Sequence, residues 1–512
     1  MAALIASTAH AVTLRAANQG DAQSMDPHAL NEALQLSLVG NVYEPLVGRD
    51  QQLALTPALA TRWTQTSPIL WRFALRRGVR FHDGTLLTAT DVVFSFQRAA
   101  GEGSDMKSYT TAIRAVRAVG DETIEIETRA PFPILPDVIS NVFIMSRAWC
   151  EANQATHPVD RRKGIENAAS FKANGTGPFQ LKERQPGTRT VLTRHAGYWA
   201  PVMSNVTEVV FTPIGNDATR VAALLSGEVD LMEPVPLQDA ARLKAAPGLK
   251  VLQGPELRTI FLGMDQRRDE LLYSDVKGRN PFKDRRVRQA FYQAIDIEAI
   301  RTRVMRGAAT PTALMLGPGV KGYPPDLDRR LPHDVEAAKR LMVEAGYASG
   351  FELGMNCPND RYVNDAEICQ AVAANLARIG VRIKLQAEPK VSYFPKVLSR
   401  QTSFYLLGWT PGTCDAHDVL SALLATPNAA GQGQANLGSY SNARVDELTA
   451  AVQSEIDPAR RNALIGEAFE LHARDIGHIP LHQQALAWGM KKNIELVQLP
   501  DNMMPFKWVT VK

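Results

Sequence analysis

The sequence Trp71-Arg-Phe-Ala-Leu-Arg-Arg-Gly-Val-Arg-Phe-His-Asp-Gly-Thr85 is followed closely by Thr88-Ala-Thr-Asp-Val-Val-Phe-Ser95. Apolar and polar residues alternate at the start of the first stretch, which predicts a β-strand with one face toward a core. Asp83-Gly84 predicts a turn, and Thr90-Asp91 is placed to cap a helix from Val92 to Arg98. A strand, a turn and a helix in this order predict a mixed α/β fold.

The rest of the chain repeats this alternation of strands and helices. At 512 residues it exceeds the roughly 250–300 residues at which one hydrophobic core stops growing, so we expect two or three lobes. The segment Asn174-Gly-Thr-Gly-Pro178 is predicted to be a loop without a regular helix or strand, and the composition of the chain changes there. The expected elements after residue 265 are helices Arg285–Arg306, Asp334–Ala345 and Asp365–Ile379 and strands Phe351–Met355, Val381–Gln386 and Phe404–Leu407.

Composition excludes several classes of protein. The hydrophobic fraction of 45% and the charged fraction of 21% are those of an ordinary globular chain, not of a disordered one. The net charge of +4 is spread without a long basic run, which disfavours a nucleic-acid-binding protein. The sequence contains no run of 18 or more apolar residues, so it predicts no membrane-spanning helix.

The N-terminus indicates export. Residues 1–11 are small and apolar and end in Ala9-His-Ala11, the A-x-A pattern of a signal-peptidase site. They lack a basic start, so we interpret them as a signal-peptide remnant; an irregular terminus is the alternative. No cysteine follows that could carry a lipid, so we expect a periplasmic protein. In that compartment Cys357 and Cys369 are close enough in sequence to form a disulfide.

Motifs for catalysis or for cofactors are missing. The sequence contains no G-x-S-x-G, G-x-x-x-x-G-K-[ST] or H-E-x-x-H pattern. His472, His478 and His482 cluster in the sequence, but Pro480 prevents the last two from sharing a helical face, so we expect solvated or core imidazoles. We therefore expect neither an enzyme nor a bound metal or cofactor.

The opening stretch resembles the family 5 extracellular solute-binding proteins, the binding components of ABC importers for peptides, nickel and glutathione. The resemblance extends from about residue 13 to residue 510. Further matches stand in the family's order: Val42-Tyr-Glu-Pro-Leu46, Gly175-Thr-Gly-Pro-Phe179, Ser226-Gly-Glu-Val-Asp230, Pro281-Phe282 with Asp284 and Val287-Arg-Gln-Ala290, Ala294-Ile-Asp296, Gly408-Trp409 and Ile479-Pro-Leu481. Most of these residues are expected to build the scaffold, not to contact a ligand.

This resemblance implies a type II periplasmic-binding-protein fold, in which two α/β lobes close over a ligand about a hinge and an extra α/β domain is attached. Carried onto this chain, lobe I takes residues 12–52, 175–265 and 485–512. The extra domain takes 53–174, and lobe III takes 266–484. The ligand belongs in the cleft between the lobes.

The first candidate ligand-binding residues follow the strand that ends at Leu407, and they are Trp409, Thr410, Asp415 and His417. Peptide-binding relatives place an Asp three residues after the Trp to hold the ligand's α-amino group, but here that position is Gly412. Asp415 or Asp418 is a candidate to supply this charge from a shifted position, but each is equally well placed to cap the helix that follows.

Arg361 is the candidate partner for a ligand carboxylate, because relatives place an arginine near this position and a guanidinium binds a carboxylate with two parallel hydrogen bonds. The alternative is a structural pair with Asp360 or Asp365. Arg258 is a weaker candidate of the same kind. Tyr109, together with Met25 and His28, is expected to line the cleft from the side of lobe I.

The function that the resemblance implies is capture of a small peptide or peptide-like solute and its delivery to an ABC permease with its ATPase subunits, by a monomer. Two alternatives remain open at this stage. One is a member that binds nickel or haem, for which His417 is the best-placed ligand. The other is a periplasmic chaperone or enzyme on the same scaffold.

Overall fold

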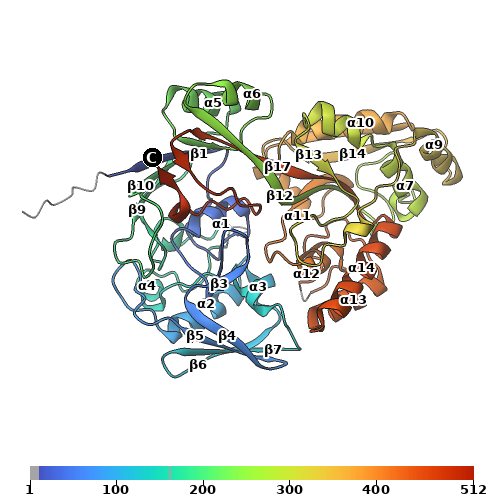
Figure 1. The fold of residues 1–512 in the computed structure, drawn as a ribbon. Helices are drawn as coiled ribbons and strands as arrows, with labels where there is room; N and C mark the ends of the chain where they lie inside the picture. Colours follow the sequence, from blue (N-terminus) through green and yellow to red (C-terminus); the bar gives the residue numbers. More distant parts are fainter. Residues whose placement is uncertain (1–10, 161–162, 430) are drawn as a thin grey trace, which may run out of the picture.

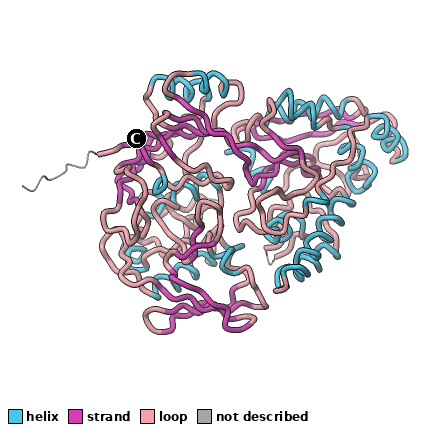
Figure 2. The backbone as a smooth tube through the Cα atoms, in the orientation of Figure 1, coloured by secondary structure: helices cyan, strands magenta, loops and turns pink. Residues whose placement is uncertain are grey.

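The computed structural model describes residues 11–160, 163–429 and 431–512. Two α/β bodies lie side by side and are joined by two long strands, β12 (Leu249–Met264) and β17 (Ile479–Lys491) (Figure 1). These strands pair antiparallel from Leu249, opposite Lys491, to Leu262, opposite Ile479. Figure 2 shows both strands passing from one body into the other. The expected signal-peptide remnant, residues 1–11, lies outside the described residues except for Ala11.

One large sheet extends to both sides of this central pair, in the order β15-β14-β16-β12-β17-β11-β1-β10-β9-β8, with β13 paired to β17. The strands of the first body are β1 (Thr13–Asn18), β8 (Phe179–Gln185), β9 (Arg189–Arg194), β10 (Glu208–Pro213) and β11 (Leu231–Glu233). Those of the second body are β13 (Ala309–Pro311), β14 (Phe351–Pro358), β15 (Val381–Glu388) and β16 (Phe404–Trp409). β1 is parallel to β10 and β11, and β14 is parallel to β15 and β16. Parallel pairs need crossover connections, and helices supply most of them here.

A separate small sheet lies at one end of the first body, at the bottom of Figure 1. Its order is β4-β5-β7-β6, with β4 (Ala60–Ser67), β5 (Leu70–Leu75), β6 (Ile113–Val119) and β7 (Thr123–Thr128). The predicted strand at Trp71 and the turn at Gly84 are confirmed, and Phe73 is fully buried. The following helix, α2 (Ala89–Ala100), starts earlier than expected, because its cap is Thr88 and not Thr90. Asp91 completes a capping box with Thr88.

The remaining helices of the first body are α1 (Ala33–Val39), α3 (Leu135–Ile139), α4 (Arg147–Ala152), α5 (Asp217–Ser226) and α6 (Ala240–Ala245). Those of the second body are α7 (Arg285–Ala294), α8 (Ile297–Ala299), α9 (Val335–Glu344), α10 (Asp365–Ala377), α11 (Lys390–Leu398), α12 (Ala416–Val419), α13 (Ala443–Ser454) and α14 (Pro458–Asp475). Two short antiparallel strand pairs complete the fold, β2 (Val47–Arg49) with β3 (Leu55–Pro57) and β18 (Ile494–Glu495) with β19 (Thr510–Val511).

The prediction of one helix over Arg285–Arg306 is wrong. The backbone of Ile295 is extended and ends α7, and the side chain of Asp296 then accepts the N–H of Ala299 at 2.9 Å to start α8. Aspartate favours a cap over a helix interior because its carboxylate competes for backbone donors. The helices expected near 334–345 and 365–379 are confirmed as α9 and α10.

The Gly-Thr-Gly-Pro loop after residue 174 passes directly against the chain at Val42. A Cβ atom on Gly175 would lie 1.9 Å from the carbonyl oxygen of Val42, and one on Gly177 would lie 2.6 Å from that of Asn41. Any side chain there would push the two segments apart. The glycines of this motif are therefore required for packing, as expected for a scaffold motif.

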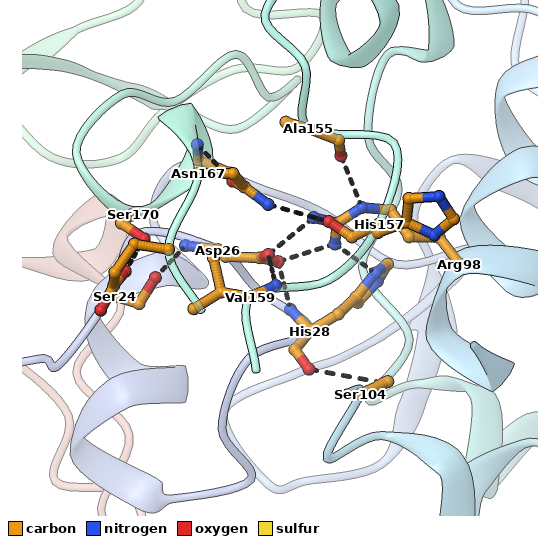
Figure 3. A network of polar contacts seen from close by, with 12 residues as sticks. Ser24, Asp26, His28, Arg98, Ser104, Ala155, His157, Val159, Asn167 and Ser170 are labelled. Carbon is orange, nitrogen blue, oxygen red and sulfur yellow. Dashed lines mark hydrogen bonds and ion pairs between the residues drawn. The ribbon is translucent and has the colours of Figure 1, made fainter. Parts of the chain in front are cut away.

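A buried ion pair fastens α2 to the loop after β1. The guanidinium of Arg98 donates to both carboxylate oxygens of Asp26, at 2.7 and 2.6 Å, and both side chains are 0% exposed (Figure 3). His28 accepts from Arg98 and contacts the carbonyl of Phe143 through its second ring nitrogen. Arg98 also donates to the carbonyls of Ala155 and His157. His28, like the fully buried Met25, is therefore part of the scaffold, and the prediction that both line the cleft is wrong because packing encloses them.

The four cysteines divide as the sequence suggests. Cys357, in β14, and Cys369, in α10, form a disulfide with 6.6 Å between their Cα atoms. Cys150 and Cys414 are buried thiols without a disulfide partner among the described residues. In that same part of the chain, no helix is both long and apolar enough to cross a bilayer.

Candidate ligand-binding cleft

A cavity of about 1550 Å³ opens between the two bodies. The first body contributes the start of α1, the segment from Tyr43 to Ala58, and residues around Trp199. The second body contributes the loop after β14, helix α11 and the loop that begins at Gly408. A smaller cavity of about 60 Å³ adjoins it next to β12 and β17. Clefts at the interface between domains are a common position for ligand sites.

Five of the seven residues predicted for the site line this cavity. They are Tyr109, Arg258, Arg361, Trp409 and Thr410. They come from distant parts of the chain, and the fold brings them together at one cleft. The hydroxyl of Thr410 is buried without a hydrogen-bond partner in the described structure.

Asp415 and His417 are not among the described residues that line the cavity. The carboxylate of Asp415 accepts the N–H of His417 at 2.8 Å as the cap of α12, and it forms an ion pair with Arg461 at 2.7 Å. The cap interpretation of Asp415 is therefore confirmed. The His417 ring packs edge-on against Phe132, and burial lowers its pKa to about 4. Both side chains therefore contact the protein instead of the cavity, and the expectation that they face the ligand is corrected.

Arg361 pairs with a residue that the sequence did not suggest. Its guanidinium lies 3.0 Å from the carboxylate of Glu32, at the start of α1. Asp365, one of the two expected partners, accepts the backbone N–H groups of Arg361 and Tyr362 instead. The other, Asp360, accepts the backbone N–H of Lys390. These carboxylates hold the loop and leave the guanidinium to the cleft.

Two further cations join Arg361 at the end of the cleft nearest the linking strands. Arg258 donates from Nε to Glu256 at 2.9 Å, and Lys390, the first residue of α11, lines both cavities. The Tyr362 ring lies 5.7 Å from the Arg258 guanidinium and 5.2 Å from that of Arg361. A cation close to an aromatic ring is attracted by the negative face of the ring. Together these side chains form a cationic wall.

The positive charges of this wall act on the carboxyl group of Glu32. Burial alone would raise the pKa of its carboxyl, but the positive charges of Arg361, Lys390 and Arg258 bring the pKa below its ordinary value. Glu32 is therefore ionised at neutral pH. Sequence reasoning missed Glu32 and Lys390, since a Glu before a helix and a Lys at the start of another are typical surface residues.

Gly412 is the position where peptide-binding relatives have an aspartate, and here the side chain of Tyr109 occupies the space beside it. A Cβ atom there would lie 2.5 Å from the hydroxyl of Tyr109. Asn141 donates from Nδ2 to the carbonyl of Gly412 at 2.8 Å. The neighbouring Trp409 donates from Nε1 to Asp418 at 2.8 Å, and burial raises the pKa of this carboxyl to about 6. An aspartate at 412 would therefore need Tyr109 to move.

Metal binding finds no support in the part of the chain that the structure describes, where no group of three or more His, Cys, Asp or Glu side chains is arranged to hold an ion. His472 and His478 hydrogen-bond each other at 3.0 Å in the core, and burial lowers the pKa of His472 to about 3. The expectation of core imidazoles is confirmed for this pair.

The comparison with known families now decides the identity of the scaffold. Residues 54–431 match the family described as bacterial extracellular solute-binding proteins, family 5. The protein belongs to this family. The glutathione-binding protein GsiB of Escherichia coli K12 is 25% identical over 482 residues, which cover 92% of this chain and 89% of GsiB.

Solved structures share the same architecture. The periplasmic binding protein DppA of Helicobacter pylori, in complex with the peptide STSA, superposes with a TM-score of 0.84 at 23% identity, covering 98% of both chains. The binding protein AgaA of A. tumefaciens R10, in complex with agropinic acid, gives a TM-score of 0.85 at 20% identity, covering 98% of this chain and 99% of AgaA. The predicted fold class, a periplasmic-binding-protein fold, is therefore confirmed.

Proposed function

We propose that this family 5 protein captures a small peptide or peptide-like solute that carries a carboxylate and delivers it, as a periplasmic monomer, to an ABC permease. The observation that supports this most strongly is the cationic wall in the cleft. Arg258 and Arg361 are paired with Glu256 and Glu32, whereas the ammonium of Lys390 has no ion-pair partner among the described residues. A third carboxyl group of this lining, Glu233, accepts from Asn18, and burial raises its pKa to about 7. A ligand carboxylate would give Lys390 a partner and would add a second hydrogen bond to Arg361.

Other residues that line the cleft suit the body of such a solute. Trp409 and Phe394 offer aromatic faces, and the hydroxyls of Thr410 and Tyr109 offer polar contacts. The volume of about 1550 Å³ exceeds that of a typical drug-sized site, which leaves room for several residues of peptide. The arrangement orients and encloses a ligand, and the lining residues suggest no nucleophile with an adjacent base.

Relatives indicate which solutes to test first. GsiB is named for glutathione, and the two structural neighbours hold a tetrapeptide and agropinic acid. Peptides and glutathione end in carboxylates, as the cationic wall requires. The space beside Gly412 is closed by Tyr109, so we expect recognition to depend more on the anionic end of the solute than on its amino group.

We infer that the lobes follow the expected division, with lobe I at residues 12–52, 175–265 and 485–512, an extra domain at 53–174 and lobe III at 266–484. The small sheet β4-β5-β7-β6 falls inside the extra domain, residues 53–174. β12 and β17 cross between the bodies, and the boundary at 485 falls within β17. Paired strands that run through both lobes are suited to bend as a hinge when the cleft closes.

Thermal unfolding with candidate solutes tests this function. A solute at a hundredfold excess over its Kd should stabilise the protein by about 2.7 kcal/mol and remain chemically unchanged. Short peptides, glutathione and opines form the first panel, with Ni²⁺ and haem as the alternatives. Consumption of a solute in proportion to protein would contradict a binding protein without turnover. Stabilisation by Ni²⁺ or haem alone would favour the metal-binding alternative.

A further inference from the structure

The Glu32–Arg361 ion pair connects the two bodies across the cleft. Glu32 caps α1 in the first body, and Arg361 stands on the loop between β14 and α10 in the second. Their side chains are 20% and 15% exposed, and both line the large cavity. A carboxylate of the protein itself therefore stands at the guanidinium that we expect to hold the ligand.

This pair is less complete than an arginine–carboxylate pair can be. Nε of Arg361 is buried and has no hydrogen-bond acceptor among the described residues. The contact with Glu32 uses the terminal nitrogen Nη2. A carboxylate that approaches the edge of a guanidinium forms two parallel hydrogen bonds and is held more strongly than one at a single nitrogen. A ligand carboxylate that reaches the Nε–Nη2 edge would therefore be held more strongly than Glu32 is.

Glu32 also keeps a stabilising role when Arg361 releases it. Its second oxygen, Oε2, accepts the backbone N–H of Gln35 at 3.0 Å as the cap of α1. Acidic side chains at a helix start are favoured by the free N–H groups and by the helix dipole. Withdrawal of Glu32 from Arg361 therefore does not leave its charge unsupported.

We propose that Glu32 is a resident competitor for the cationic wall: it bridges the lobes in the empty protein and is displaced by the carboxylate of the solute. This proposal rests on the proposed function, because it assigns the ligand carboxylate to the same guanidinium. Glu32 then determines specificity in two ways. It lowers the affinity for every carboxylate, and it excludes anions that cannot bond Arg361 better than a single oxygen does.

The opposite role for Glu32 would be an acceptor for the ammonium group of the ligand, and the two roles predict opposite effects of mutation. Glu32→Gln removes the competing charge. Glu32→Asp keeps the charge and the cap but shortens the side chain away from Arg361. Glu298→Gln, at an exposed ion pair with Arg301 outside the cavity, is the control for the loss of one negative charge.

The first experiment needs no ligand. We expect small-angle X-ray scattering of the empty protein to give a larger radius of gyration for Glu32→Gln and Glu32→Asp than for the wild type and Glu298→Gln. Raising the salt from 0.05 to 1 M should expand the wild type in the same direction, since salt screens a partly exposed pair. Equal radii for all four proteins would overturn the bridging role.

The second experiment uses the tripeptide Ala-Ala-Ala, its C-terminal amide and glutathione in calorimetric titrations. Loss of the competitor should increase the affinity of Glu32→Gln for the two carboxylate probes about fivefold and leave that for the amide unchanged. Weaker binding of every probe would overturn the proposal and make Glu32 a ligand contact. If the wild type binds none of the probes, the proposed solute class fails, while the scattering result still decides the role of Glu32.

Discussion

Two arginine–carboxylate pairs in this protein have the same chemistry and different surroundings. Arg98 and Asp26 are 0% exposed, share two hydrogen bonds and are surrounded by carbonyl acceptors (Figure 3). Arg361 and Glu32 are partly exposed beside a large cavity, and Nε of Arg361 has no acceptor in the described structure. The first pair has no capacity left for a ligand. The second pair lies beside a cavity and keeps one N–H group without an acceptor among the described residues. The number of hydrogen bonds already made by the arginine therefore distinguishes the scaffold pair from the pair at the candidate site.

The largest effect is expected at the buried pair. Asp26→Ala removes one partner and leaves the Arg98 guanidinium buried without its counter-charge, which should lower the free energy of unfolding by about 3–5 kcal/mol. Thermal or urea unfolding measures this loss. Replacing both partners by apolar residues, Asp26→Leu with Arg98→Met, should recover part of it. A loss below about 1 kcal/mol in the single variant would contradict the structural role of the pair.

Arg361→Ala should act on binding instead. Removal of the guanidinium leaves a ligand carboxylate without its partner and should reduce affinity by roughly 2–5 kcal/mol, about thirtyfold or more. Arg361→Lys should recover only part of this, because an ammonium cannot form the two parallel bonds. Calorimetric titration with the first solute that stabilises the wild type provides the values. Unchanged affinity would transfer the carboxylate site to Arg258 or Lys390.

The disulfide Cys357–Cys369 encloses the loop that carries Arg361. The double variant Cys357→Ser/Cys369→Ser should lower the free energy of unfolding by about 3 kcal/mol, the effect expected for so short a closed loop. Reductant should destabilise the wild type by a similar amount and have no effect on the double variant, which serves as its control. Four alkylated thiols in protein exported to the periplasm of an expression host and never reduced would contradict the disulfide.

The smallest effect on stability is expected for Glu32→Gln. The Glu32–Arg361 pair is partly exposed, so its loss should cost no more than about 1 kcal/mol at neutral pH. The pKa of Glu32 is lowered in the folded protein, so this contribution is present above the ordinary carboxyl pKa and is lost as the pH falls through the lowered one. Unfolding of wild type and variant should therefore converge in acid. A difference that grows below pH 4 would contradict this sign.

Much of the fold followed from the sequence because local signals and tertiary packing agree there. The alternation at Trp71–Leu75 and the turn at Gly84 are fixed by short-range chemistry. The break at Ile295 was missed because the apolar spacing continues across it, and only the packed structure shows that Asp296 caps a new helix. Periodicity predicts the existence of an element better than its ends.

The site was predicted less completely, for a physical reason. Arg361 and Trp409 stand next to strand ends, which a linear pattern can identify. Glu32 and Lys390 gain their role only because the fold brings α1 and α11 to the same cavity. Asp415 carries the right charge in the right loop, but Arg461, far along the chain, neutralises it. Partners at long sequence separation are not visible in one sequence.

Native mass spectrometry of the protein released from periplasm without denaturation tests the central claim most directly. Closed clefts of this kind retain bound solute, so the mass added to the wild type identifies the class of ligand. We predict a small solute with at least one carboxylate, present on the wild type and absent from Arg361→Ala purified in parallel. A retained metal, haem or cationic solute without a carboxylate, or equal occupancy of both proteins, would contradict the assignment of the cationic wall as the ligand anchor.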